Sequence, residues 1–337
     1  MSGERSERAG MAEPLRIGTR GSGLALAQTG WVAERLRALG QAVTIETIST
    51  RGDVQGEAPL TTLGGDGVFV RELEKALREG RIDLAVHSLK DLPTAPSGGL
   101  EIGCVPARAC PFDAFVGLAG ESLATLPAGA IVGTSSIRRV VQVRALRPDL
   151  DVRPIRGNVD TRLRKLDAGE YRGLVLAAAG LERLGLGHRI TELLSPPEFW
   201  PAVGQGALGL QIRAADGVVK SAVAPLDDVA SRAAVEAERA CLAELSAGCL
   251  APVGACGRGN GDGRVVLSVR VFEERDGSVR HVTAEAGADH EESCKERQNR
   301  SPAGGDESAA ALGRRVAELL LAAGAGPMLE RMRQSFG

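Results

Sequence analysis

Aromatic residues are scarce in this sequence, at 3% of 337 residues with a single tyrosine. Proteins that hold single-stranded nucleic acid commonly stack its bases on aromatic side chains. The scarcity therefore argues against a nucleic-acid partner. Long apolar runs are also missing, because no segment approaches the roughly 20 apolar residues that a membrane-spanning helix needs. We expect no membrane partner.

Cysteine is present, but in no metal-binding pattern. The six cysteines show no C-x-x-C pair and no neighbouring histidine pattern; they are Cys104, Cys110, Cys241, Cys249, Cys256 and Cys294. We therefore predict no metal site and no disulfide framework. Residues 1–13 are polar and lack the apolar core of a signal peptide. We expect a cytoplasmic protein with a disordered leader over 1–13 and with Met1 or Met11 as its true start.

The most distinctive feature is a basic stretch over residues 130–165. From Arg138 to Lys165 it has eight arginines and one lysine against three aspartates, although the net charge of the chain is only -2. Its pattern predicts a βαβα unit in which Arg138 and Arg139 begin a helix. A helix start disfavours cations, so this placement favours an anion-binding site over a solvated basic helix face.

A first βαβαβ pattern precedes this stretch. The predicted elements are a strand at 15–19, a helix at 24–39, a strand at 43–49, a helix with Phe69, Leu73 and Leu77 on one stripe, and a strand at 82–86. In both patterns a Gly-Thr pair ends a strand just before a helix, at Gly18-Thr19 and at Gly133-Thr134. Residues 104–112 read as a segment that crosses between two units. Residues 201–210 read as a return that ends in a strand of the first unit.

The remaining chain predicts a small α+β unit. Its expected elements are a helix at 236–245, strands at 265–272 and 279–285 with a turn at Asp276-Gly277, and helices at 309–321 and 328–332. The predicted fold is thus α/β, with two tandem βαβ-type lobes arranged as in solute receptors, plus a small α+β C-terminal domain. The expected domains are 1–106 with 207–226, then 107–206, then 227–337 with a polar insertion at 287–308.

Eight strings in order resemble the porphobilinogen deaminase family, also called hydroxymethylbilane synthase, from residue 15 to about 285. They are TRGS at 19–22, TRGD at 50–53, HSLKDLP at 87–93, GTSSIRR at 133–139, RGNVDTR at 156–162, AAGLERLG at 178–185, AVGQGA at 202–207 and ERACLAELSAGCLAP at 238–252. The resemblance implies a transferase of porphyrin and heme biosynthesis. Its members condense four porphobilinogen molecules head to tail, release ammonia, and free a linear tetrapyrrole. The family also implies a monomer with a covalently bound dipyrromethane primer.

The resemblance assigns roles to the matching positions. Asp91 matches the catalytic aspartate, and Cys249 matches the cysteine that holds the primer by a thioether. Primer contacts are further implied for Ser88, Lys90, Thr134, Ser135, Ser136, Arg138, Arg139, Asn158, Arg162 and Arg183. Substrate contacts are implied for Arg20, Ser22, Arg156, Gln205 and Gly206.

Other interpretations of these residues remain open at this point. A cysteine such as Cys249 is often a small buried apolar residue, and Lys90-Asp91 after a strand can form a loop salt bridge or a turn cap. The alternative function is a two-lobed receptor for a small anion, without catalysis. Three positions also depart from the family pattern: Asp66 stands where lysine is common, Gly23 where proline is usual, and Ala247 where the cysteine loop usually has glycine.

Overall fold

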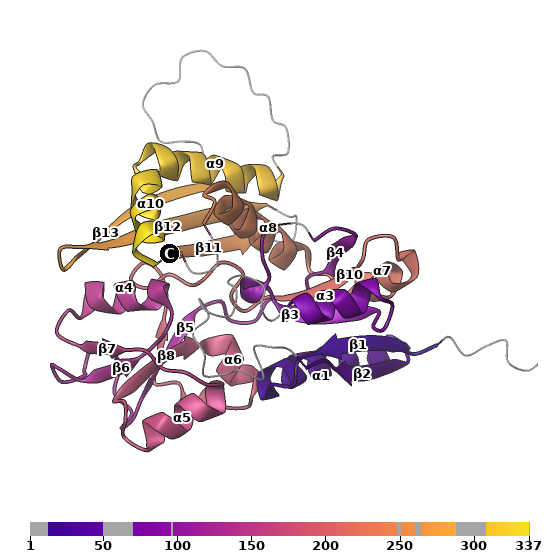
Figure 1. The fold of residues 1–337 in the computed structure, drawn as a ribbon, viewed down its shortest axis with the longest axis horizontal. Coiled ribbons are helices and arrows are strands. Elements are labelled where there is room, and N and C mark those ends of the chain that lie inside the picture. The colour runs from indigo at the N-terminus through magenta and orange to yellow at the C-terminus, as the bar shows by residue number, and fades with distance from the viewer. Residues whose placement is uncertain are drawn as a thin grey trace, which may run out of the picture.

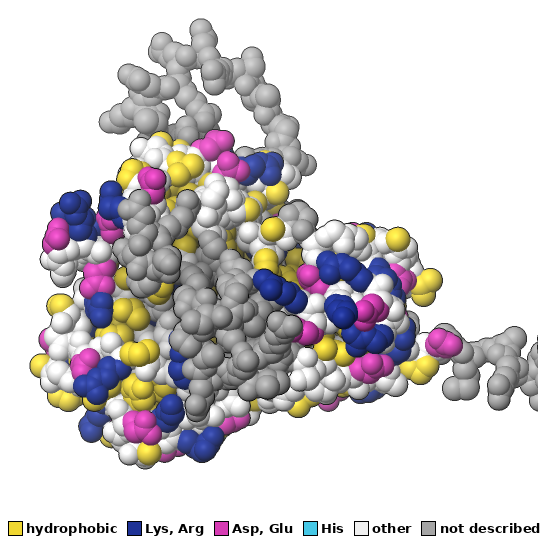
Figure 2. Space-filling view, in the orientation of Figure 1, with side chains coloured by type: hydrophobic (Ala, Val, Ile, Leu, Met, Phe, Trp, Pro, Cys, Tyr) yellow, Lys and Arg dark blue, Asp and Glu magenta, His cyan; other side chains and the backbone are white. Residues whose placement is uncertain are grey.

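The computed structural model describes residues 13–49, 70–95, 97–247, 251–259, 264–287 and 308–336, with side chains described to residue 332. It contains three sheets, each covered by helices. Figure 1 shows two lobes side by side, and a third domain lying across both of them. The fold class predicted from the sequence is therefore confirmed. On the face drawn in Figure 2, basic and acidic side chains are interspersed over the lobes.

The first lobe has a five-stranded sheet in the order β2-β1-β3-β10-β4. Its strands are β1 (Leu15–Thr19), β2 (Val43–Thr47), β3 (Leu84–Ser88), β4 (Leu100–Cys104) and β10 (Leu208–Arg213). Strand β1 is parallel to β2 and β3, whereas β10 is antiparallel to β3 and β4. Its helices are α1 (Gly23–Ala38), α3 (Arg71–Arg78), α7 (Gly217–Val223) and the short 3₁₀ helices η1 (Leu89–Asp91) and η3 (Ala224–Leu226).

The second lobe repeats this arrangement, with the order β7-β6-β8-β5-β9. Its strands are β5 (Asp113–Gly117), β6 (Ile131–Gly133), β7 (Asp151–Arg153), β8 (Gly173–Ala177) and β9 (Glu192–Leu194). Its helices are α4 (Ile137–Leu146), α5 (Val159–Asp167), α6 (Ala178–Arg183) and the 3₁₀ helix η2 (Gly187–Arg189). In each sheet the antiparallel fourth strand arrives from the other lobe, as β10 does in the first and β5 in the second. The predicted return of the chain into the first sheet is confirmed.

The third domain packs helices on one antiparallel sheet, β11-β12-β13. Its elements are α8 (Val229–Glu244), β11 (Val253–Gly259), β12 (Val265–Arg275), β13 (Ser278–Gly287), α9 (Ala309–Ala322) and α10 (Ala325–Phe336). Aliphatic residues from α8, α9 and the sheet form one core. The β12–β13 hairpin turns at Asp276 and Gly277, both with positive φ, as that residue pair predicts.

Two predicted elements lie elsewhere along the chain. Strand β3 occupies residues 84–88 rather than 82–86, because its pairing with β1 begins at Leu84 opposite Ile17. Helix α8 begins at Val229 rather than at 236, and Asp228 caps it by accepting a hydrogen bond from Ser231 N at 2.8 Å. Three predicted features lie wholly or largely outside the described residues. They are Phe69, the leader over residues 1–12, and residues 288–307, which form the greater part of the predicted insertion. Within the described ranges, no helix is long and apolar enough to cross a membrane.

Candidate active site

The predicted site residues gather where parallel strands end. Arg20 follows β1, Lys90 follows β3, and Thr134 follows β6. In open α/β sheets this edge is where ligands bind, because helix N-termini and loops converge there. The fold therefore brings motifs from both lobes to corresponding edges of the two sheets.

The turn after β3 carries the predicted catalytic residue. Asp91 ends η1 and is exposed, whereas Lys90 is half-buried. No salt bridge joins these two side chains; Lys90 Nζ instead lies 3.5 Å from Gln205 Oε1. Burial lowers the pKa of Lys90 to about 8, an effect that the nearby Asp91 carboxylate partly opposes. Asp91 thus projects from an anchored turn and remains available for chemistry.

Side chains behind the turn hold it in place. Gln28, buried on α1, donates to Ser88 Oγ at 2.9 Å. His87 Nε2 lies 3.0 Å from Gln211 Oε1. Burial lowers the pKa of His87 to about 4, so this imidazole is neutral near pH 7. The strand that leads to Asp91 is therefore tied to its neighbours on both faces of the sheet.

A buried aspartate that sequence analysis did not identify organises the second lobe's edge. Asp113 is fully buried and accepts from Arg138 Nη1 at 2.7 Å and from Arg139 Nη2 at 2.7 Å. Gln205 Nε2 donates to the same carboxylate at 3.0 Å. Burial opposes ionisation, but the charges of Arg138 and Arg139 outweigh it and lower the pKa of Asp113 to about 2. One carboxylate thus fixes two predicted primer-binding arginines.

The two arginines retain binding capacity toward an anion. Arg138 and Arg139 are only 4% and 7% exposed, and together they carry one more positive charge than Asp113 neutralises. Arg138 Nε is buried and has no hydrogen-bond partner among the described residues. An unsatisfied buried donor is costly. Such a donor favours an acceptor from a bound ligand.

Three further arginines stand without carboxylate partners. Arg156, Arg162 and Arg183 are half-buried and form no salt bridge within the described part of the chain. Arg162 Nε donates to Gly157 O at 2.8 Å. Burial, and then repulsion from Arg139 and Arg156, lowers the pKa of Arg162 to about 10. Mutual repulsion of this kind makes a bound polyanion strongly favourable.

The smaller polar residues of the predicted site have local partners. Ser22 Oγ accepts from Ala25 N and caps α1, and Asn158 Oδ1 accepts from Thr161 N and caps α5. Ser135 Oγ donates to Ile155 O at 2.7 Å. Thr134 is buried and its hydroxyl accepts from the Ser136 backbone. These contacts account for the residue types by local structure, and ligand contacts remain a prediction for each.

Gln205 and Gly206, predicted as substrate contacts, lie in the return segment. The Gln205 side chain is 1% exposed and also donates to Pro111 O at 2.8 Å. These bonds give Gln205 a role in joining the two crossing segments, and its substrate contact stays a prediction. Gly206 has a φ of 84°, and a Cβ there would lie 2.6 Å from Ala109 O. Its own carbonyl accepts from Arg183 Nη2 at 2.7 Å.

A second buried ion pair, also missed from the sequence, joins these segments to the third domain. Arg108 Nη1 donates to Glu238 Oε1 at 2.8 Å, and Glu238 is fully buried on α8. The carboxylate also accepts from the backbone of Gly204 and Gly257. In the sequence, Glu238 is a charged residue at a helix position that faces the core, and this could have indicated a buried ion pair. The sequence does not reveal its partner, which lies 130 residues away.

Two residues of special interest, Cys249 and Asp66, lie outside the described residues. Helix α8 ends at Glu244, and the chain is described to Ala247 and again from Ala251.

Two residues after β1 complete the set. Arg20 is half-buried. At Gly23 a Cβ would meet nothing closer than 3.8 Å, so a side chain of at least one carbon fits there.

Fold and site together define a class: a two-lobed α/β protein with a third domain, whose central residues carry an excess of guanidinium groups suited to a polycarboxylate ligand. A family model described as "Porphobilinogen deaminase, dipyromethane cofactor binding domain" matches residues 15–221. The chain belongs to the porphobilinogen deaminase family, as its sequence motifs predicted.

Individual relatives extend the match over nearly the whole chain. The porphobilinogen deaminase of Desulforudis audaxviator is 47% identical over 325 residues, covering 96% of this chain and 99% of the relative. That of Roseiflexus castenholzii is 54% identical over 254 residues, or 75% and 84% of the two chains.

Solved structures with a similar arrangement include two binding proteins. A periplasmic substrate-binding protein of an ABC transporter from Coxiella burnetii has a TM-score of 0.40 and 15% identity over 63% of this chain and 91% of that one. The methionine-binding protein MetQ has a TM-score of 0.41 and 13% identity over 63% and 89% of the two chains.

Proposed function

We propose that this protein is a hydroxymethylbilane synthase. It joins four porphobilinogen molecules head to tail through new carbon–carbon bonds, releases one ammonia for each, and frees the linear tetrapyrrole hydroxymethylbilane for porphyrin and heme biosynthesis. The observation that carries the proposal is the group of arginines at the lobe edges, which includes the buried Arg138 with its unpaired Nε.

The charge of the reactants explains why this group is needed. Each pyrrole ring carries an acetate and a propionate, so every addition brings two more carboxylates into the protein. Burying them without partners would cost several kcal/mol or more per charge. Arg156, Arg162 and Arg183 have no competing carboxylate in the described chain, and Arg20 lies at the corresponding edge of the first lobe. Together they are suited to neutralise this charge.

The same residues suit a dipyrromethane primer. Bound through Cys249, the primer would supply the free pyrrole carbon to which each substrate unit is joined. Arg138, Arg139, Arg162, Arg183 and Lys90 would hold its carboxylates. Ser88, Thr134, Ser135, Ser136 and Asn158 would add neutral hydrogen bonds. The buried unpaired Arg138 Nε and the lowered pKa of Arg162 fit such an anionic group.

Asp91 is the proposed catalytic residue. When porphobilinogen loses ammonia it becomes a cationic methylene-pyrrolenine, and a nearby carboxylate stabilises that charge and accepts a proton. Asp91 is exposed at the end of η1, and it forms no salt bridge with any described residue. The same turn thus carries a cation and an anion. Lys90 would bind carboxylates, and Asp91 would stabilise the reacting ring.

Intact mass tests this proposal directly. The purified protein should be heavier than its sequence by a two-ring pyrrole adduct and should consume porphobilinogen. Cys249→Ser should lose both the adduct and the activity, whereas Cys110→Ser, a change at a half-buried thiol, should retain both. An unmodified wild-type protein that does not react with porphobilinogen would refute the assignment.

The receptor without catalysis is not favoured, because the chain's relatives carry the name of a deaminase. The division into domains at 1–106 with 207–226, 107–206 and 227–337 remains part of the proposal, as do the cytoplasmic location and the monomeric state. Proteolysis, cell fractionation and light scattering test these three predictions.

A further inference from the structure

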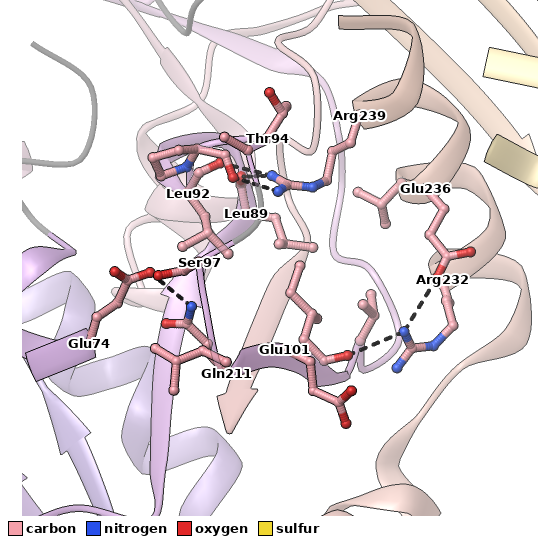
Figure 3. A pocket seen from close by; sticks show the side chains of 16 residues that line it. Glu74, Leu89, Leu92, Thr94, Ser97, Glu101, Gln211, Arg232, Glu236 and Arg239 are labelled. Carbon is pink, nitrogen blue, oxygen red and sulfur yellow. Dashed lines mark hydrogen bonds and ion pairs between the residues drawn. The ribbon is translucent and has the colours of Figure 1, made fainter. Parts of the chain in front are cut away.

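Arg239 of α8 binds the backbone of the segment that carries the proposed catalytic residue. Its Nη1 donates to Leu92 O at 2.8 Å, and its Nη2 donates to Pro93 O at 2.7 Å. A longer contact of 3.4 Å joins Nη1 to Leu89 O. Leu92 and Pro93 directly follow η1 and Leu89 begins it, so one guanidinium contacts both ends of the turn, most closely just after Asp91. Figure 3 shows this guanidinium pointing at the segment from the neighbouring helix.

We propose that Arg239 is a positioning residue: it sets the location of Asp91 by fixing the backbone of the Leu89–Pro93 turn to the third domain. The inference rests on the proposed function, since it concerns the efficiency of the proposed reaction. It assigns Arg239 no contact with substrate or primer.

Packing around the contact shows why the guanidinium matters. A cavity of about 320 Å³ lies between the first lobe and α8, and Leu92, Pro93 and Arg239 line it. Leu89 and Leu92 pack with Val235 of α8, and these three residues also line the cavity. Charge-assisted hydrogen bonds are strong and directional, whereas apolar contacts at a cavity edge allow sliding.

The remaining supports of the turn come from a different part of the molecule. Leu89 N donates to Ala207 O at 3.0 Å, and Lys90 Nζ lies near Gln205. Both partners belong to the return segment. They fix the start of the turn to the lobes. Among the described residues, Arg239 is the side chain that donates to the carbonyls that follow Asp91.

Helix α8 also links this contact to the proposed primer attachment. Arg239 lies about one and a half turns before the helix end at Glu244, and Cys249 follows that end by five residues. A helix transmits position rigidly over this length. Arg239 therefore holds Asp91 to the same rigid element from which the primer loop begins.

Arg232 provides a matched control on the same helix face. It precedes Arg239 by seven residues, or about two turns, and lines the same cavity. It also bridges α8 to the first lobe, because its Nη2 donates to Gly103 O at 3.1 Å and its Nε pairs with Asp227. It does not contact the turn that ends at Asp91. Loss of either arginine weakens the interface, but only loss of Arg239 releases that turn.

The experiment compares Arg239→Met, Arg239→Lys and Arg232→Met in the full-length protein with its adduct. A misplacement of a catalytic group by about 1 Å can cost on the order of 100-fold in rate. We expect Arg239→Met to lower kcat about 10- to 100-fold with KM unchanged and the adduct retained by intact mass. Arg239→Lys should recover part of the rate, because an ammonium can still donate to one carbonyl. Arg232→Met should retain kcat within about twofold.

A double-mutant cycle with Asp91→Asn separates positioning from general destabilisation. If Arg239 acts through Asp91, then Arg239→Met should lower kcat no further in the Asp91→Asn background. Equal kcat losses in the Arg239 and Arg232 variants, loss of the adduct in Arg239→Met, or full additivity with Asp91→Asn would each overturn the inference. Should Arg239→Met not fold, a wild-type kcat in Arg239→Lys would overturn it and a reduced one would support it. An inert wild-type protein would instead refute the proposed function.

Discussion

Asp91 and Asp113 show how position gives one residue type two different uses. Asp113 is fully buried, and the two arginines beside it outweigh the effect of burial and hold its pKa at about 2. It is therefore a permanent structural anion that orients Arg138 and Arg139. Asp91 is exposed at the end of a short turn and has no salt-bridge partner among the described residues. Environment thus separates a structural carboxylate from an exposed one, and we propose the exposed one for catalysis.

Replacing Asp91 by asparagine should remove most of the turnover while leaving the shape of the turn intact. The amide cannot neutralise a cationic ring or accept its proton, effects that typically contribute 10²–10⁴-fold. We expect kcat to fall by about 10²-fold or more, with little change in melting temperature because the side chain is exposed. Steady-state kinetics and thermal unfolding measure both quantities.

The control for this variant is Glu170→Gln, which removes another exposed carboxylate without a salt bridge in the described chain. It should leave kcat unchanged. A turnover near that of the wild type in Asp91→Asn would exclude this residue from the mechanism.

At the scale of single elements, several helices begin at a capping side chain. Ser22 caps α1, Asn158 caps α5, Asp216 caps α7 and Asp228 caps α8. Helix α4 is not capped in this way, because Ser136 makes no side-chain cap bond, and Arg138 lies in its first turn. Its N-terminus therefore keeps free N–H groups beside guanidiniums. A helix start of this kind favours an anion.

Asn158 allows a test of capping against ligand binding. Asn158→Ala should destabilise the protein by about 1 kcal/mol, because α5 loses the bond to Thr161 N. Asn158→Asp should retain stability, since a carboxylate caps equally well. If Asn158 also contacts the primer, the added charge of Asp should impair adduct retention or turnover. Thermal unfolding and intact mass distinguish these effects, and equal stability of Ala and Asn would contradict the capping role.

At the scale of the whole molecule, three bodies are joined by buried polar contacts and by small apolar clusters, such as Leu89 and Leu92 with Val235 of α8. The chain crosses from the first lobe into strand β5 of the second, and it returns into strand β10 of the first. The segments bond to each other through Gln205 and to the third domain through Arg108 and Glu238. The geometry of the site thus depends on a few buried charges.

Glu238→Gln should be strongly destabilising, because it leaves Arg108 buried without its counter-charge. Breaking a buried pair in this way typically costs about 3–5 kcal/mol. Glu236→Gln, two residues away on the same helix but exposed, should cost less than about 1 kcal/mol. Urea unfolding measures both values. Equal stability of the two variants would show that the Arg108–Glu238 pair does not hold the domains together.

Local pattern was enough to determine much of this protein. Strand β1 has its predicted bounds, the two βαβ patterns became sheets of the same order, and the motif strings identified the family. Strand alternation, helix periodicity and turn residues are properties of neighbouring positions. They can therefore be recognised in the sequence without knowing which distant residues they contact. The shifted start of β3 shows the limit, because burial of Ile82 resembles strand burial although its pairing begins two residues later.

Tertiary structure decided which charges are partners. Asp113 meets arginines 25 and 26 residues away, Glu238 meets Arg108 across 130 residues, and Arg239 reaches Leu92 across 147. The sequence by itself determined the elements and the presence of an arginine-rich edge. Only the fold determined which guanidiniums pair with a buried carboxylate, as Arg138 and Arg139 do, and which have no carboxylate partner in the described chain, because ion pairing depends on distance in space and not along the chain.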